Sequence, residues 1–429
     1  MEMKRYKLGE IATVEISGVD KKAKENEKPI KLCNFTDVYH NWAITRDMEI
    51  SFMDATATDK EIDTFVLKKG QVAFTKDSET RDDIGIPTYI ADDFDNVILG
   101  YHTALITPDK TNLSGKYLNA FMNSNFIKKY FENNASGSGQ RYTLSNDTLN
   151  SIPIILPEIS IQEKIGEFFS NIDRKIALNK KINAKLEAMA KRLYDYWFVQ
   201  FDYPDKNGKP YKTSGGKMVW NEVLKREIPE GWEVKSVNDI SVSYRGVGST
   251  ADDEKSAEDN DVVLILRGNN ISNNHIIYDG NTVYLDKSFV SEEQKIHKYD
   301  FVMTMSSGSK EHVGKSAMFL FDSPHSYGAF CNKITPAKDC QFFLENYLHS
   351  EYFKKYIQIT CSGTGINNLT NEHFDKAFFP FPDNEVLESF NQKIKPIYEQ
   401  IGVLEKENLR LMGLRDKLLP LLMNGQVQI

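Results

Sequence analysis

Two long stretches of the chain carry apolar residues at helical spacing. The first follows Ser160-Ile161-Gln162-Glu163, which has the spacing of a capping box, and its apolar residues fall on heptad positions a and d. A helix over 161–197 would be roughly 55 Å long, more than one compact domain usually covers. We therefore expect the two stretches to pair as an antiparallel coiled coil. The expected seam residues are Ile165, Phe168, Ile172, Asn179, Ile182, Leu186, Met189 and Leu193 in the first stretch, and Ile397, Leu404, Leu411, Leu414 and Leu418 in the second.

Two residues interrupt these apolar stripes. Asn179 lies in the first seam, where a polar side chain costs stability but can fix the alignment with one partner helix. Pro396 lies in the second stretch and should kink or split that helix, because proline lacks the N–H that continues the hydrogen-bond ladder.

The residues before each long stretch are typical of β-rich domains. Short runs of β-branched and aromatic residues at 63–67, 71–75 and 96–100 are separated by turn formers, and 262–266 and 301–305 repeat this pattern. Apolar residues recur at helical spacing over 114–133 and again over 344–357, which predicts one helix in each domain.

The second half of the chain repeats the first at a spacing of 225 to 229 residues, as residues 118–130 and 344–356 show most clearly. This period is far longer than that of solenoid repeats, so whole domains were duplicated. The predicted fold class is α+β: two mixed, β-rich domains, each followed by a long helix, with the helices paired antiparallel in pseudo-two-fold symmetry. The expected boundaries are 1–157 for the first domain, 158–198 for its helix, 199–229 for a linker, 230–382 for the second domain and 383–429 for the second helix.

Composition places the chain among ordinary globular proteins. It has 40% hydrophobic residues, no apolar stretch of membrane-spanning length and no signal-peptide pattern after Met1. The four cysteines are scattered without a C-x-x-C pair, which indicates a reducing, cytoplasmic location. The net charge of -8 is unfavourable for binding nucleic acid, unless a local basic face or a partner supplies positive charge.

The sequence contains no recognisable catalytic constellation. Gly314-Lys315-Ser316 lacks the earlier glycine of a phosphate-binding loop, because position 309 is serine. The eight histidines show no metal-ligand spacing, so no metal site is expected. Duplication without catalytic groups indicates binding. Three readings stay open: a DNA reader that works with partners, a stand-alone DNA-binding regulator, and a coiled-coil scaffold that does not bind DNA.

Several segments carry a family resemblance. Residues 157–165, Trp197-Phe198, 210–217 and 228–232 resemble the conserved regions of type I restriction-modification specificity subunits, and the duplicated layout extends the resemblance over nearly the whole chain. The second copy departs from the first at Leu387 and Pro396, which raises the expectation that the two helices contact partners unequally.

The resemblance implies a non-catalytic subunit that selects the DNA sequence. Two modification (methyltransferase) subunits would dock on the helices, and restriction subunits with ATP-dependent translocase and nuclease activity would join them. S-adenosylmethionine, ATP and Mg would then be bound by partner subunits and not by this chain. A duplicated reader with two-fold symmetry predicts a bipartite double-stranded DNA target, with two half-sites separated by unread base pairs.

Candidate base-reading residues are those in polar loops whose side chains suit base edges. Arg and Lys favour guanine, and Asn and Gln favour adenine. Arg141 and Tyr142 rank first, because they adjoin a glycine turn that can approach DNA closely. The full set is Lys76, Arg81, Gln140, Arg141 and Tyr142 in the first domain, and Arg245, Arg267, Asn269, Asn270, Lys310, Lys315, Asn367 and Asn368 in the second.

Overall fold

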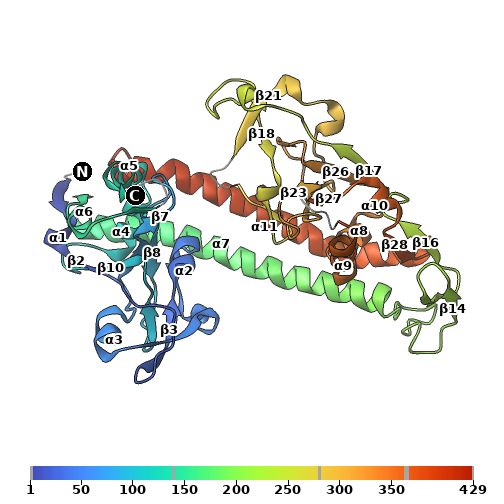
Figure 1. Ribbon diagram of the computed structural model, residues 1–429, viewed down its shortest axis with the longest axis horizontal. Helices are drawn as coiled ribbons and strands as arrows, with labels where there is room; N and C mark the ends of the chain where they lie inside the picture. The colour runs from blue at the N-terminus through green and yellow to red at the C-terminus, as the bar shows by residue number, and fades with distance from the viewer. Residues whose placement is uncertain (1–2, 138–140, 279–281, 362–366, 428–429) are drawn as a thin grey trace. The chain divides into compact units, whose positions relative to one another are not determined.

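The computed structural model describes residues 3–137, 141–278, 282–361 and 367–427. It separates into two compact units: unit 1 comprises Met1–Asn179 and Glu407–Ile429, and unit 2 comprises Lys180–Lys406. The chain passes from one unit to the other inside two long helices, α7 (Ile159–Tyr194) and α11 (Asn384–Met423) (Figure 1).

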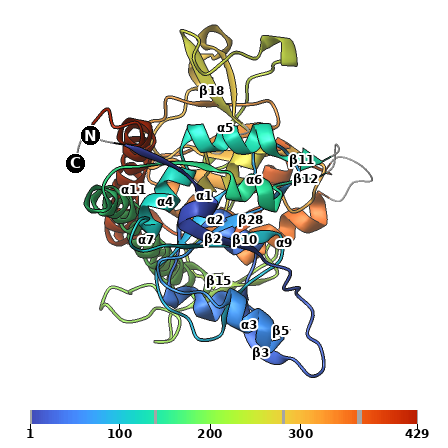
Figure 2. The same cartoon turned by 90° about the vertical axis from the view of Figure 1, so that its left-hand side faces the viewer.

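Unit 1 is built on a five-stranded sheet of order β2-β10-β6-β8-β4 and a three-stranded sheet of order β5-β3-β9. Strands β1 and β13 pair separately, and β11, β12 and β7 form a small sheet. Helix α3 lies near β3 in both views (Figures 1 and 2). The strands are β1 Lys4–Lys7, β2 Ala12–Ile16, β3 Lys28–Cys33, β4 Ala43–Ile44, β5 Met53–Ala57, β6 Val72–Thr75, β7 Asp77–Ser78, β8 Pro87–Ile90, β9 Val97–Leu99, β10 Thr103–Pro108, β11 Ser136–Gly137, β12 Tyr142–Thr143 and β13 Pro153–Leu156. The helices before α7 are α1 Leu8–Ile11, α2 Phe35–His40, α3 Asp59–Phe65, α4 Gly115–Met122, α5 Asn125–Asn134 and α6 Asn146–Asn150, with a 3-10 turn at Arg46–Ser51.

Unit 2 has a four-stranded sheet of order β17-β26-β22-β24 and a three-stranded sheet of order β21-β18-β25. Strand β16 pairs with β28, and β23 pairs with β27. The strands are β14 Met218–Asn221, β15 Arg226–Pro229, β16 Glu233–Ser236, β17 Ser241–Arg245, β18 Val262–Leu266, β19 Ile271–Ser272, β20 His275–Ile276, β21 Val283–Asp286, β22 Phe301–Thr304, β23 Ser306–Ser307, β24 Ser316–Met318, β25 Ser326–Tyr327, β26 Cys331–Pro336, β27 Asn367–Asn368 and β28 Phe378–Phe381. The helices before α11 are α8 Gln341–Leu348, α9 Glu351–Thr360 and α10 Asn371–Asp375, with a π-helical turn at Asp195–Val199 and 3-10 turns at Ala251–Asp253, Gly268–Asn270, Lys287–Phe289 and Glu292–Gln294.

The two units repeat one topology. The order β2-β10-β6-β8 of unit 1 corresponds to β17-β26-β22-β24 of unit 2, and β5-β3-β9 corresponds to β21-β18-β25. In both three-stranded sheets one neighbour of the central strand is antiparallel and the other is parallel. The structure therefore has the predicted α+β class, with two β-rich domains that are each followed by a long helix.

Three local predictions were wrong. Residues 63–67 were expected to form a strand, but Asp59–Phe65 is a helix, because Thr58 and Glu61 form a reciprocal capping box. The single helix expected over 114–133 is two helices, since Ser124 is extended and starts α5. The helix expected over 344–357 also breaks, and Ser350 Oγ caps α9 by accepting from Phe353 N at 3.2 Å.

The capping box expected at the start of α7 does not form. Helix α7 begins at Ile159, so Ser160 lies inside it and is not its N-cap. The Gln162 side chain is buried, and its Oε1 accepts from Ser114 N at 3.0 Å while its Nε2 donates to the Asn112 and Pro157 carbonyl oxygens. Gly166 lies one turn further along, where a Cβ would be 2.6 Å from Lys116 Cβ. The N-terminal part of α7 is thus fixed to the loop before α4, and only glycine allows this close approach.

The buried face of α7 is rotated relative to the predicted seam. Ile165, Ile172 and Asn179 are buried, as predicted. Between them, however, the buried residues are Phe169 and Ile176, whereas the predicted Phe168 is only half-buried. Met189 and Leu414 are 54% and 41% exposed, so their assignment to the seam was wrong. Leu404 is buried, and the seam candidates that are half-buried are Phe168, Ile182, Leu186, Leu193, Ile397, Leu411 and Leu418. Counted from Ile165, the buried residues of α7 are spaced by four and then three residues, whereas the predicted seam was spaced by three and then four.

Pro396 does not split the second helix. Helix α11 runs unbroken from Asn384 to Met423, and Pro396 is exposed within it. One lost hydrogen bond in a helix of 40 residues is compensated by the burial of neighbours such as Ile394 and Tyr398, which are 0% and 5% exposed.

Polar contacts link α7 and α11 within each unit. In unit 1, Asn179 Nδ2 donates to Glu407 Oε2 at 2.8 Å and to Asn408 Oδ1 at 2.9 Å. In unit 2, the imidazole of His275 lies 3.2 Å from carboxylate oxygens of both Glu187 and Glu405. In unit 1 one residue of α7 bonds two residues of α11, and in unit 2 His275 bridges one residue of each helix, so these contacts constrain the alignment of the pair.

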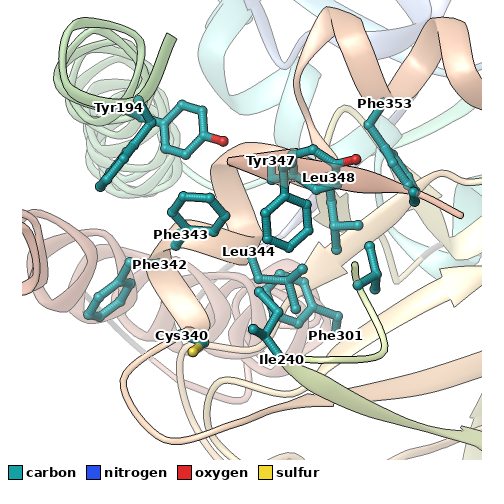
Figure 3. Close-up of a cluster of buried hydrophobic side chains, with 14 of the residues drawn as sticks. Tyr194, Ile240, Phe301, Cys340, Phe342, Phe343, Leu344, Tyr347, Leu348 and Phe353 are labelled. Atoms are coloured by element: carbon teal, nitrogen blue, oxygen red, sulfur yellow. The ribbon is translucent and has the colours of Figure 1, made fainter. Parts of the chain in front are cut away.

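The segment expected to be a linker, 199–229, is folded. It contains the hairpin β14–β15 and contributes to an aromatic cluster in which the Tyr203 ring centroid is 4.7 Å from Tyr211 and 5.2 Å from Trp232. The main core of unit 2 continues from α7 through α8 to β22, with the side chains of Tyr194, Phe343 and Phe301 directed inward (Figure 3).

The corrected face of α7 predicts a contrast between two adjacent phenylalanines. Phe169 is completely buried, so Phe169→Ala should lower the free energy of unfolding of unit 1 by about 3–5 kcal/mol. Phe168 is only half-buried, so Phe168→Ala should cost clearly less. Chemical denaturation followed by circular dichroism measures both. Equal losses, or a larger loss for Phe168→Ala, would contradict the observed face.

The contacts of His275 predict that the stability of unit 2 falls as the pH becomes alkaline. Its hydrogen bonds with Glu187 and Glu405 outweigh partial burial and raise the pKa of His275 to about 10. This contribution should be complete below the ordinary pKa of about 6.5 and should disappear as the pH rises toward 10. Titration by NMR should show the raised pKa in the native chain and a lower one in Glu187→Gln/Glu405→Gln. A native His275 that titrates near 6.5 would refute the bridge.

Candidate nucleic-acid interface

A short three-stranded ladder positions the leading candidates of unit 1. Tyr142 pairs with Gly137 on one side and with Ser78 on the other, in the small sheet β11-β12-β7. Gly137 has φ +150, and a Cβ there would lie 2.1 Å from the Arg141 carbonyl oxygen. Glycine is therefore required at this position for the two strands to close beside Arg141. The candidate Gln140 lies outside the described residues.

A cluster of charged side chains surrounds Asp77 in β7. Asp77 Oδ1 lies 3.0 Å from Lys76 Nζ, while Oδ2 lies 2.6 Å from His102 Nδ1 and 3.2 Å from Arg141 Nη2. Burial alone would raise the pKa of Asp77, but hydrogen bonds involving Thr143, Lys76 and His102 outweigh burial and lower it. The anion holds these basic groups in place.

The basic residues around Asp77 differ in how accessible their charged groups are. Lys76 is 16% exposed and also donates to Thr143 Oγ1 at 2.7 Å, so its ammonium group is occupied within the protein. Arg141 keeps 55% of its side chain exposed, and the guanidinium of Arg81 lies 5.0 Å from the centre of the Tyr142 ring. Arg81, Arg141 and Tyr142 thus present a guanidinium-rich surface. Asp77 and His102 could not be selected from the sequence, because their role depends on contacts between residues distant along the chain.

The corresponding strands of unit 2 carry different side chains. Ser306 in β23 pairs with Asn368 in β27, and Ser306 Oγ donates to Asn368 Oδ1 at 2.6 Å. Asn367 pairs with Ser307 in the same ladder. Where unit 1 has an ion cluster on this small sheet, unit 2 has hydroxyl and amide groups.

The remaining candidates of unit 2 divide by exposure. Asn270 is fully buried, and its amide binds Arg267 N and the Ile277 carbonyl oxygen, so it cannot read a base and its selection was wrong. Arg267 is exposed and pairs with Glu254 at 2.9 Å. Lys315 is half-buried, with Nζ 3.4 Å from His312 Nδ1. The other candidates, Arg245, Asn269 and Lys310, are exposed.

Unit 2 also contains a cleft of about 540 Å³ beside these residues. Arg267, Asn269, Ser306 and Ser307 line it together with Phe330, which is 68% exposed. Phe330 was not a candidate from the sequence, since a lone phenylalanine after a glycine turn resembles an ordinary core residue.

Neither a metal site nor a membrane span is found in the described part of the chain. No group of three or more His, Cys, Asp or Glu side chains among those residues is arranged to hold a metal ion. No helix there is both long and apolar enough to cross a membrane.

Comparison with known proteins identifies the family. Residues 1–188 and 229–409 match the type I restriction modification DNA specificity domain. The HindI specificity subunit of Haemophilus influenzae is 25% identical over 410 residues, which cover 84% of this chain and 87% of that protein. The StySPI specificity subunit of Salmonella potsdam is 32% identical over 179 residues, 41% of this chain and 38% of that protein. The type I restriction-modification S subunit of M. genitalium has the same fold, with a TM-score of 0.54 at 13% identity, and the match covers 98% of this chain and 96% of that one.

The chain therefore belongs to the type I restriction-modification specificity subunits, and the resemblance inferred from its conserved segments is confirmed. Membership makes it a non-catalytic DNA recognition subunit, without a catalytic cofactor of its own, that assembles with other subunits.

Proposed function

We propose that this chain reads a bipartite double-stranded DNA target through two half-sites separated by unread base pairs. The observation that carries the proposal is the duplicated small sheet, which bears Arg141 and Tyr142 in unit 1 but Ser306 and Asn368 in unit 2. One frame with unlike side chains suits two unlike half-sites, because base identity is read by the side chains that reach the groove.

The proposal assigns catalysis to partners. Two methyltransferase subunits that bind S-adenosylmethionine dock on the helices, and restriction subunits that use ATP and Mg join the assembly. The complex works in the cytoplasm, where it reaches its DNA. Because the chain has a net charge of -8, the partners supply much of the positive charge that phosphates require.

An apolar hollow of unit 2 supports docking on α7. It has a volume of about 620 Å³ and is lined by Met189, Leu193, Tyr196 and Ile397 together with polar residues. Met189 and Tyr196 are 54% and 38% exposed, which leaves apolar surface of a long helix open to a partner. A helix of a methyltransferase subunit is the occupant we propose, since apolar helix faces pair readily with one another.

Methylation mapping tests the recognition role. DNA exposed to the chain with its methyltransferase subunits should carry methylated adenine at a bipartite motif, and Arg141→Ala should reduce methylation at that motif by roughly 5- to 150-fold, as the loss of a base contact worth about 1–3 kcal/mol predicts. Arg5→Ala is the matched control, because Arg5 is exposed in unit 1 but lies on β1, outside both the small sheet and the long helices that dock the partners. Random methylation, or equal effects of the two variants, would contradict the proposal.

Helix length tests the spacing of the half-sites. Four residues inserted between Asn179 and Lys180, and four between Lys406 and Glu407, fall at the boundaries of the units and leave the contacts within each unit intact. The spacer should lengthen by roughly 6 Å, which is nearly two base pairs, while both half-sites stay the same. Retention of the original spacing in the mapped motif would refute a helical ruler.

A further inference from the structure

Phe330 stands on a rigid turn between β25 and β26. Its carbonyl oxygen accepts from Met305 N at 2.8 Å and from Ser306 N at 3.3 Å, and Cys331 N donates to the Gly328 carbonyl oxygen at 2.8 Å. The backbone is thus tied to β22 and β23, while 68% of the residue is exposed. A single exposed apolar side chain is common on protein surfaces, so exposure alone assigns no role.

The cleft beside Phe330 provides the second observation. Its rim carries Arg267, Asn269 and Ser307, and its wall includes Thr304, which is 1% exposed. Thr304 Oγ1 has no strong hydrogen-bond partner within the described part of the chain. The Thr304 side chain also interacts with the Cys331 thiol, but a thiol is a weak hydrogen-bonding group. A buried hydroxyl without a good partner, beneath an apolar ring and a polar rim, suits a flat ligand with polar edges.

Comparison of the units shows that this opening is particular to unit 2. Phe330 precedes β26 just as His102 precedes β10, the equivalent strand of unit 1. His102 is held by Asp77 and contacts Arg141, so that position is filled by charged groups. The same point of the shared frame therefore presents an ion cluster in unit 1 and an unpaired aromatic face in unit 2.

We propose that Phe330 stacks on a base that leaves the helical stack of the second half-site, while the polar edge of that base enters the cleft. The proposal rests on the DNA-reading function above and adds a mode of recognition that differs between the units. Aromatic side chains stack on unstacked bases of any sequence, and steps that unstack easily favour such contacts. The second half-site is thus selected partly by how readily it deforms.

Fluorescence of 2-aminopurine tests the stacking. 2-Aminopurine replaces one purine of the second half-site at a time, and the methylated adenine is left unchanged. Each duplex is then bound by the chain together with its methyltransferase subunits. The native complex should show raised fluorescence at one position, because unstacking relieves quenching. Phe330→Ala should abolish this rise and weaken binding by about 5- to 150-fold. Phe330→Trp should retain both properties.

The control is Trp220→Ala, since Trp220 is 58% exposed in the hairpin β14–β15 of unit 2 and should leave both measurements unchanged. Absence of raised fluorescence in the native complex, or an undiminished rise in Phe330→Ala, overturns the stacking. Weaker binding of Phe330→Ala without a fluorescence change also overturns it and leaves a simple contact. Failure of the native complex to bind any bipartite duplex is a different result, because it refutes the DNA-reading function itself.

Discussion

The structure depends on the burial of one continuous face along each long helix. A helix in a protein draws most of its stability from the packing of its apolar face and less from backbone propensity, so α7 and α11, with 36 and 40 residues, must each keep that face covered along its length. Within unit 1 that face joins α7 to the β-rich domain through Phe169 and Gln162, and within unit 2 it ends in the aromatic cluster around Tyr194. Fixing the helix face therefore fixes which side chains of each helix remain outside, Met189 among them.

The sequence was sufficient for the architecture, because duplication and amphipathic length are properties of long stretches. The sequence was insufficient where two adjacent apolar residues of a helix could each have been the buried one. Phe168 and Phe169 are both phenylalanine, so only packing against the domain decides which is buried. Ser160 and Glu163 likewise met the capping-box pattern, yet helix α7 begins at Ile159, and the neighbouring Gln162 bonds to the Ser114 amide and the Asn112 carbonyl oxygen about 50 residues away along the chain. A short local sequence pattern is therefore overridden by tertiary contacts with residues far away along the chain.

The candidate site was predictable to a similar extent. Glycine turns and polar loops indicated the region around Arg141, but exposure could not be read from residue type, as the buried Asn270 shows. Asp77, His102 and Phe330 escaped notice because their roles come from contacts across strands. A duplicated fold makes such residues interpretable, since each position in one unit has a counterpart that shows what the frame allows. In this chain the two units share one strand order, but the side chains at equivalent positions differ.

The division of the chain has a consequence for how the protein is made. Unit 2 is continuous in sequence, whereas unit 1 requires Glu407–Ile429, including the buried Leu419, Leu422 and Met423. Synthesis from the N-terminus therefore produces the first recognition domain early but completes its apolar core last. Until residues 407–427 have left the ribosome, the exposed face of α7 in unit 1 is a surface that chaperones can bind, and a chain that stops short of Glu407 has a complete second domain and an unfinished first one.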